Sequence, residues 1–286
     1  MWKLTPPAAD DAEADLLRAL TLANGDLVFE TSPEQRTALI QLYQRYDGTR
    51  GRPSVELMGV ALGAGFVEAI YSAYDQVQER RRLAHLRDRL KAGILRCPYC
   101  GFGEVTDLDH HLARSVYRAL AIYCKNLIPS CHHCNNRKRT VGGHDPEEQF
   151  SHPYLDEYPA GRFLFAQATV SPLGGLRVEF AIVQCDGMAN DVFARLRFQF
   201  SRLELNRRYE AQVVDFIMSH RPSIEEVAEN GPEALRAWLS RMRDVHERGY
   251  GLNDWRTALI DSLLRSDEFC EGGFRYTFGV SPQVGA

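Results

Sequence analysis

The segment that decides the fold contains two Cys-x-x-Cys pairs. Residues 97–139 read CPYCGFGEVTDLDHHLARSVYRALAIYCKNLIPSCHHCNNRKR, and the pairs are Cys97/Cys100 and Cys131/Cys134. Each pair forms a tight turn that points both sulfurs inward, and four thiolates are a common ligand set for structural zinc. Such a short segment cannot bury enough surface to hold itself rigid. We therefore expect a zinc ion that clamps a hairpin against a helix.

A redox function is the alternative for the first pair. Cys97-Pro98-Tyr99-Cys100 also matches the active-site tetrapeptide of glutaredoxin-like enzymes, which needs the second cysteine inside a helix. Gly101-Phe102-Gly103 would break such a helix, and a redox site leaves the second pair unexplained, so zinc is favoured. The remaining cysteines are expected to be small buried apolar residues: Cys124, Cys185 and Cys270.

Polar residues lie between and just after the cysteine pairs. Residues 105–110 alternate like a strand, residues 121–124 could form its partner, and 131–139 resemble a helix start. Asp109 and His110 end the first strand, and Asn135 directly follows the last cysteine. Carboxylate and amide oxygens suit Mg²⁺ or Mn²⁺, and a neutral imidazole can take a proton from water. These are the parts that phosphodiester hydrolysis requires.

These motifs together resemble a known family. The chain is similar to the zinc-stapled, four-cysteine branch of the HNH endonucleases, which have the ββα-metal fold, and residues 108–131 are similar to a bacterial subgroup found among anti-phage defence genes. The motif-dense part is 97–154, and pieces at 152–154 and 269–274 also fit. The matching residues are Cys97, Cys100, Asp109, His110, Asn126, Leu127, Ile128, Pro129, Cys131, Cys134, Asn135 and Lys138.

The resemblance implies a role for each site residue. His110 would be the general base, and Asp109 and Asn135 would bind one catalytic Mg²⁺ or Mn²⁺ ion. Asn126 would hydrogen-bond across the loop and hold the strand of His110, although a turn-forming Asn is the rival interpretation. Lys138, with Arg137, would contact phosphate, and a solvated helix face is the alternative.

The chain departs from the family pattern in one place. Leu112-Ala113-Arg114 stands where relatives often have Leu-Pro-Lys, so that Arg114 keeps the charge expected to contact DNA. His111 replaces the usual aromatic residue. These changes could alter how the substrate fits, and they leave the metal and base positions intact.

The rest of the chain is mainly helical by pattern. We expect an α+β protein in three parts: an N-terminal helical region (1–93), the HNH module (94–155), and a mostly helical region with a β-hairpin (156–286). Asp10 and Ser32 are candidate helix caps. Hairpin strands are expected at 163–170 and 176–183. Helices are expected at 10–24, 33–47, from Ser54, from Gly65 to Gly93, and at 190–203, 206–220, 223–229, 232–248 and 253–266.

Composition limits the class of protein. The 286 residues are 44% hydrophobic with a net charge of −4, no apolar run long enough to span a bilayer is present, and the start of the chain has no signal-peptide segment. A soluble cytoplasmic protein is therefore expected. Arginines crowd into residues 80–96 and recur at 137–139, which indicates either a basic face for a polyanion or an ordinary solvated helix face.

The leading functional hypothesis is a metal-dependent DNA endonuclease, which by resemblance leaves 5′-phosphate products. One alternative is a zinc module that binds nucleic acid or acts as a scaffold without turnover. Asp109, His110 and Asn135 discriminate between the two, because such a module has no need of them. The other is an RNA-cleaving toxin nuclease with the same site. The helical flanks could form a homo-oligomer interface, clamp DNA, or dock an ATPase or sensor subunit of a defence system.

Overall fold

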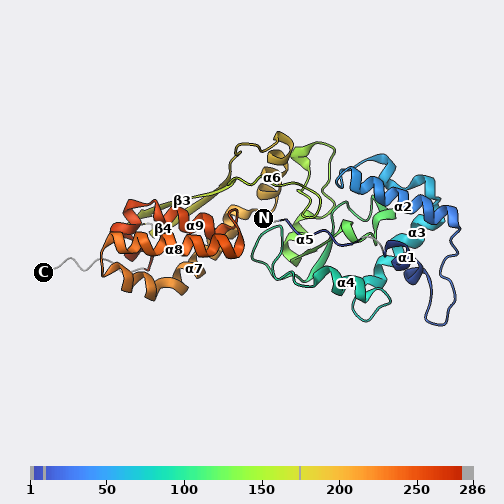
Figure 1. Ribbon diagram of the computed structural model, residues 1–286, viewed down its shortest axis with the longest axis horizontal. Coiled ribbons are helices and arrows are strands. Elements are labelled where there is room, and N and C mark those ends of the chain that lie inside the picture. Colours follow the sequence, from blue (N-terminus) through green and yellow to red (C-terminus); the bar gives the residue numbers. More distant parts are fainter. Residues whose placement is uncertain (1–2, 9–10, 174, 279–286) are drawn as a thin grey trace. The chain divides into compact units, whose positions relative to one another are not determined.

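The chain folds into two compact units of mixed α and β structure. The computed structural model describes residues 3–8, 11–173 and 175–278. The first unit, here the cysteine unit, comprises Lys3–Tyr158 and Ala194–Gln199, and the C-terminal unit comprises Pro159–Phe193 and the chain from Phe200 (Figure 1). The predicted boundary between 93 and 94 lies inside the cysteine unit, and the three-part division stays a prediction.

The cysteine unit begins with helices α1 (Ala12–Leu20) and α2 (Pro33–Gly48). The predicted cap of α2 is confirmed: Ser32 Oγ accepts from the Gln35 backbone N–H at 3.2 Å, and the Ser32 N–H donates to Gln35 Oε1 at 3.0 Å. This reciprocal pairing satisfies two donors that the helix start would otherwise leave free. The other predicted cap, Asp10, lies outside the described residues.

The long helix predicted after Gly65 is wrong. Helix α3 (Ala64–Ala73) ends in a 3₁₀ turn, Tyr74–Val77, and α4 starts only at Ala84 and runs to Lys91. The stretch from Ser54 also forms 3₁₀ turns, Val55–Met58 and Val60–Leu62. Apolar residues on both sides of the break enter one core, so helical spacing persists through it and conceals it.

A strand pair and a short helix carry the cysteine motifs. Strand β1 (Asp107–His110) pairs antiparallel with β2 (Leu127–Ser130), and α5 (His132–Lys138) follows. The predicted partner strand at 121–124 is therefore wrong. Residues 121–123 are buried between two 3₁₀ turns, Arg118–Leu120 and Cys124–Asn126, and such a buried apolar run has the same appearance in sequence as a buried strand. The predicted helix start at 131–139 is confirmed.

One hydrophobic core joins these elements. It includes buried residues of all four N-terminal helices together with β1, the turns before β2, and the start of β2. The helical region and the strand pair are therefore packed as one structure. Within the described residues, no single helix has the length and apolarity to cross a membrane, and Val55–Leu62 with Ala64–Val77 reaches that composition only as a pair bent by 114°.

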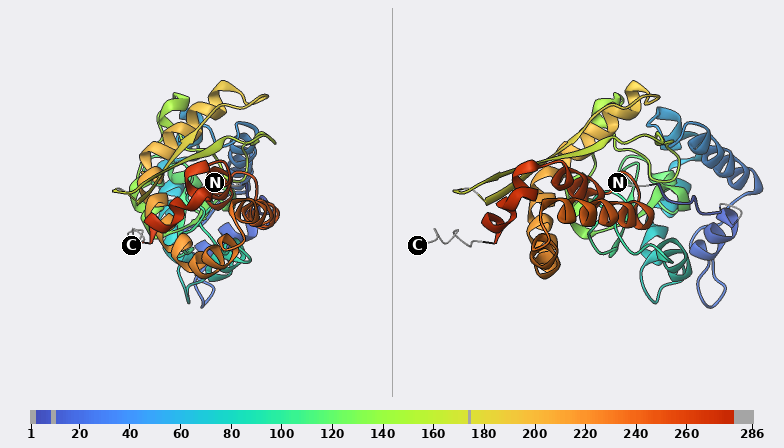
Figure 2. Two further views of the ribbon diagram at one scale, coloured as in Figure 1. Left: turned by 90° about the vertical axis from the view of Figure 1, so that its left-hand side faces the viewer. Right: turned by 60° about the vertical axis from the view of Figure 1, so that its left-hand side comes forward.

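The C-terminal unit contains the predicted hairpin, which is confirmed. Strands β3 (Leu164–Ser171) and β4 (Gly175–Ile182) pair antiparallel, with Ala168 opposite Val178. Helix α9 (Trp255–Leu264) packs against β3, and helix α7 (Leu205–Ala228) packs against β4; Figure 2 gives two further views of the hairpin and the C-terminal helices. The other helices of this unit are α8 (Pro232–Tyr250) and α10 (Phe274–Thr277), whereas α6 (Asn190–Arg202) has its central residues, Ala194–Gln199, in the cysteine unit.

Two helices predicted separately, 206–220 and 223–229, form the single helix α7. Pro222 lies inside it and removes one backbone hydrogen bond. Ile217 and Ile224 are each 1% exposed, one on either side of the proline. Their burial holds the helix together across a residue that local propensity treats as a stop.

Candidate metal centre and active site

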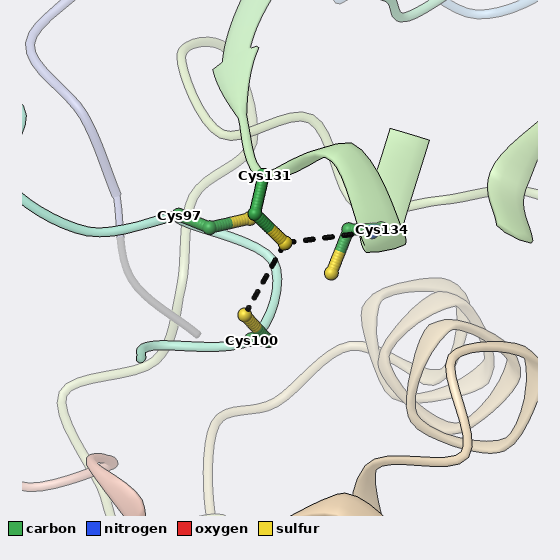
Figure 3. Close-up of side chains that lie close together, drawn as sticks. All are labelled: Cys97, Cys100, Cys131 and Cys134. Atoms are coloured by element: carbon green, nitrogen blue, oxygen red, sulfur yellow. Dashed lines mark hydrogen bonds between the residues drawn. The ribbon is translucent and has the colours of Figure 1, made fainter. Parts of the chain in front are cut away.

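The four cysteines of the two pairs converge on one point. Cys97 and Cys100 lie in the turn before β1, Cys131 is the N-cap of α5, and Cys134 lies in its first turn (Figure 3). Their sulfurs all lie within 4.8 Å of one another, with Cys100 Sγ and Cys131 Sγ 3.9 Å apart. In a tetrahedral zinc site with Zn–S of about 2.3 Å, adjacent sulfurs are about 3.8 Å apart. The buried cluster is therefore compatible with structural zinc.

Backbone N–H groups support the sulfurs. The Gly103 N–H donates to Cys100 Sγ at 3.3 Å, and the Cys134 N–H donates to Cys131 Sγ at 3.4 Å. A Cβ at position 103 would lie 2.8 Å from Cys131 Sγ, so only glycine fits there without displacing the sulfur. Gly103, one of the two glycines that argued against a redox helix, thus has a positive function in the turn.

The protonation of the cluster is linked to the binding of a cation. Burial raises the pKa of the Cys97 thiol well above its usual value, because charged sulfur is poorly solvated there. Several neighbouring thiolates are unfavourable without a positive charge between them. A divalent ion removes this penalty, and its binding releases protons. Within the described residues, this is the one group of three or more His, Cys, Asp or Glu ligand atoms close enough to hold a metal.

Asp109 is buried beside the cluster and paired with Lys138. Its carboxylate, 3% exposed, accepts from Tyr99 Oη at 2.8 Å and lies 3.1 Å from Lys138 Nζ. Burial raises the pKa of Asp109, and the ammonium opposes that rise. Lys138 is 0% exposed and also donates to the His110 carbonyl at 2.6 Å. The predicted phosphate contact therefore does not describe this conformation, in which the ammonium neutralises Asp109.

His110 is held in one orientation. Its Nε2 donates to the Ala121 carbonyl at 2.9 Å, because a carbonyl can only accept, and its ring packs edge-on against Tyr74 at 4.4 Å. Nδ1 is then the basic nitrogen. Burial lowers the pKa of His110 to about 3, with Lys138 and Arg114 acting in the same direction. The imidazole is consequently neutral at physiological pH and can accept a proton.

Asn126 bridges the loop between the strands. Its Oδ1 accepts from the Leu112 N–H at 2.8 Å, and its Nδ2 donates to the carbonyls of Leu112 and Leu120 at 3.2 Å. The cross-loop contact is where it was predicted, while its effect on His110 stays a prediction. Tyr46 of α2 also donates to Oδ1 at 3.1 Å and accepts from His152 Nε2 at 2.9 Å. No sequence pattern pointed to Tyr46, which lies 80 residues before Asn126.

Asn135 contacts a different carboxylate from the one predicted. Its Nδ2 donates to Asp107 Oδ2 at 2.9 Å, and His132 Nδ1 donates to the same oxygen at 3.0 Å. Partial burial raises the pKa of Asp107, but hydrogen bonds from Asn135 and His132 outweigh that effect and lower it overall. Asp107 was missed from the sequence. Strand alternation could have found it, because residues 107 and 109 share one face of β1.

Cationic and aromatic side chains surround His110. The Arg114 guanidinium lies 4.2 Å from the Tyr71 ring centroid and 4.9 Å from that of Tyr74, and Arg118 lies 4.5 Å from Tyr71. Arg114 also pairs with the exposed Asp75 at 3.4 Å. Arg118 pairs with Glu68. Both arginines are partly exposed and held in place by the rings, so an anionic substrate would contact them in competition with these two surface carboxylates.

Two basic residues of the predicted arginine-rich stretch reach β1. Arg87 and Lys91 donate to the Thr106 carbonyl at 2.6 and 3.2 Å. Arg137, predicted to contact phosphate, donates to His133 Nε2 at 3.0 Å on the exposed side of α5. Arg87 and Lys91 therefore contact the chain at the start of β1, and Arg137 lies on α5.

Comparison with known proteins finds a similar phage protein and no matching family model. No family model matches the chain, and no solved structure matches it. Protein ea31 of Escherichia phage lambda is 29% identical over 245 residues, which cover 79% of this chain and 81% of that protein. The chain is therefore similar to a phage protein along most of both lengths.

Proposed function

We propose that this protein is a metal-dependent HNH-type endonuclease that hydrolyses DNA to 5′-phosphate products. One observation carries the proposal: strand β1 with its Asp-His pair, strand β2 and helix α5 are closed at one end by four converging cysteines. A zinc module that only binds or scaffolds requires the cysteines alone. The partly exposed His110 on β1 is what favours catalysis.

His110 would act as the general base. Its Nε2–H is held by the Ala121 carbonyl, which leaves Nδ1 to take a proton from water. A pKa of about 3 keeps the imidazole neutral, and a phosphate anion beside it would raise that pKa towards a more effective value. The Tyr74 ring restricts its rotation. The low pKa of His110 in the protein without substrate therefore suits a base that becomes active when the anionic substrate binds.

A divalent cation would supply charge neutralisation at the phosphate and the leaving oxygen. The residues predicted to hold it fit unequally. Asn135 is half-buried and close to a carboxylate that solvent can reach. Asp109 is buried, and both of its oxygens are engaged by Tyr99 and Lys138. The donor types suit Mg²⁺ or Mn²⁺, but a cation at Asp109 would have to displace a buried ammonium.

The surface around His110 supports a polyanionic substrate. Arg114 and Arg118 stack on Tyr71, and the Arg114 guanidinium also lies over Tyr74, whose ring contacts His110. A phosphate backbone that follows these cations would pass the imidazole. Each lost phosphate contact should weaken binding and reduce its salt dependence by about one unit of slope.

The wider proposal is an enzyme of bacterial anti-phage defence that acts in the cytoplasm. It rests on the resemblance of residues 108–131 to a defence subgroup, and the similarity to a phage protein is compatible with such a setting. The helical regions would then form a homo-oligomer interface or dock an ATPase or sensor subunit. Co-purification of a tagged chain with the products of neighbouring genes tests the second alternative.

The central experiment compares His110→Ala with His144→Ala, a change at an exposed histidine. Plasmid DNA, single-stranded DNA and total RNA are each incubated with protein and Mg²⁺ or Mn²⁺. We expect His110→Ala to lose DNA cleavage while its zinc content and thermal midpoint match the parent, and His144→Ala to cleave normally. Parental cleavage by His110→Ala would refute the assigned base. Cleavage of RNA alone would favour the toxin alternative, and binding in EDTA without cleavage under any condition would favour the scaffold.

A further inference from the structure

A second cluster of ligand-type side chains lies at the start of β1, outside the four cysteines. It consists of Asp107 on β1 with His132 and Asn135, which are three residues apart on α5. Asp107 Oδ2 accepts from His132 Nδ1 at 3.0 Å and from Asn135 Nδ2 at 2.9 Å. The side chains of Asp107 and His132 are 24% and 78% exposed, so solvent and ions can reach the cluster.

The spacing of these atoms suits an octahedral cation. Ligands about 2.1 Å from a central Mg²⁺ or Mn²⁺ lie about 3.0 Å from their neighbours along each edge of the octahedron. The two measured separations, 3.0 and 2.9 Å, match two such edges. A half-turn of the Asn135 amide directs Oδ1 at the same place, and His132 Nδ1 is the ring nitrogen that already faces it. Cation binding therefore needs only local side-chain changes.

Asp109 is a poorer cation ligand than Asp107, because its carboxylate is already engaged. Tyr99 Oη lies 2.8 Å from Oδ2, and Lys138 Nζ lies 3.2 Å from Oδ1 and 3.1 Å from Oδ2. Lys138 is 0% exposed, so it cannot move aside into water without opening the core. A divalent ion at this carboxylate would lie close to an ammonium that already compensates the charge.

We propose that Asp107, His132 and Asn135 bind a divalent cation, and that Asp107 rather than Asp109 is its carboxylate ligand. The inference rests on the proposed function for the role of that cation. One imidazole and two oxygen donors favour Mn²⁺ over Mg²⁺ and Ca²⁺, which take oxygen ligands alone. Arg87 and Lys91, both bonded to the carbonyl of the preceding residue Thr106, place positive charge beside the cluster for a phosphate to contact.

The test titrates the zinc-loaded full chain with Mn²⁺ and follows free Mn²⁺ by electron paramagnetic resonance. Asp107→Asn should lower Mn²⁺ affinity at least about tenfold. Asn135→Asp should raise it by adding a charged ligand, while the exposed control Asn136→Asp should not change it. The double variant Asp109→Asn/Lys138→Met removes the buried pair together and should bind Mn²⁺ like the parent. Zinc content and thermal midpoint are measured for every variant.

Two results would overturn the assignment: undiminished Mn²⁺ binding by Asp107→Asn, or loss of binding only in the double variant at 109 and 138. Cleavage is measured separately, so the two proposals can fail independently. A parent that binds Mn²⁺ through Asp107 but cuts no nucleic acid keeps the site and removes the nuclease. A parent that cuts DNA with Mg²⁺ while Asp107→Asn binds Mn²⁺ normally keeps the nuclease and removes the site.

Discussion

Replacing Cys131 with serine tests the metal centre directly. Serine keeps a side-chain oxygen that can cap α5, so the change removes a zinc ligand while leaving the N-cap in place. The matched control is Cys124→Ser, another buried thiol, which is outside the cluster and 3% exposed. The half-buried Cys185→Ser is a second control.

We expect Cys131→Ser to lose much more stability than Cys124→Ser. Strands β1 and β2 have 4 residues each and α5 has 7, so these elements have little stability of their own. Structural zinc contributes on the order of 10 kcal/mol, comparable with the whole stability of a typical domain. Cys131→Ser should therefore cost on the order of 5–10 kcal/mol. Cys124→Ser should cost about 1–2 kcal/mol, within the ordinary range for a single buried substitution.

The assay combines elemental analysis with calorimetric unfolding. Each kcal/mol lowers the midpoint by about 2–4 °C for a unit of this size, so Cys124→Ser should shift it by less than about 10 °C and retain zinc. Cys131→Ser should lose zinc and either shift the midpoint by about 10–40 °C or lose its cooperative transition. Equal midpoints and equal zinc contents for the three variants would refute a four-thiolate site.

Three further predictions follow from the packing and charges. Gly103→Ala, whose Cβ would lie 2.8 Å from Cys131 Sγ, should weaken zinc binding in a chelator competition, whereas Gly142→Ala, with nothing within 4 Å, should not. Lys138→Met leaves Asp109 buried without its counter-charge and should cost about 3–5 kcal/mol in denaturant unfolding. Adding Asp109→Asn should recover most of this loss. A cost below about 1 kcal/mol, as expected for breaking the exposed Arg50–Glu157 pair, would contradict a buried ion pair. His111 is buried with a pKa held well below 6.5 by burial, and within the described residues its Nδ1 has no hydrogen-bond partner. Below pH 6.5 the His111 imidazole binds a proton in the unfolded chain but stays neutral in the folded chain, so the free energy of unfolding falls as pH falls from 6.5. His111→Phe should make this fall shallower. An unchanged dependence of unfolding free energy on pH, at constant zinc content, would contradict the prediction.

The capped start of α2, the β3–β4 hairpin and the helix after Cys131 could be predicted from sequence because their signals are local. A capping residue, a turn and a strand period each act over a few residues. The break between α3 and α4 and the identity of β2 could not be predicted. Both depend on which face of an apolar run enters the core, and residues far apart in the chain decide that.

For the candidate site, too, some features could be predicted from the sequence and others could not. The cysteine spacing alone predicted the metal cluster, since two tight turns with paired thiols leave few other uses for them. Three contacts of the site could not be predicted from the sequence: Asp109 with Lys138, Tyr46 with Asn126, and Asp107 with Asn135. Each depends on the register of β1 against α5 or on the docking of α2.

The order of residues thus determined which chemical groups this protein has and which short turns present them, because turn and cap formation are nearest-neighbour effects. Tertiary structure decided which charges are compensated: it buried Asp109 with an ammonium and left Asp107 in reach of solvent on the same strand. The physical reason is desolvation. The cost of a buried charge depends on what long-range packing places beside it, and no local pattern encodes that neighbour.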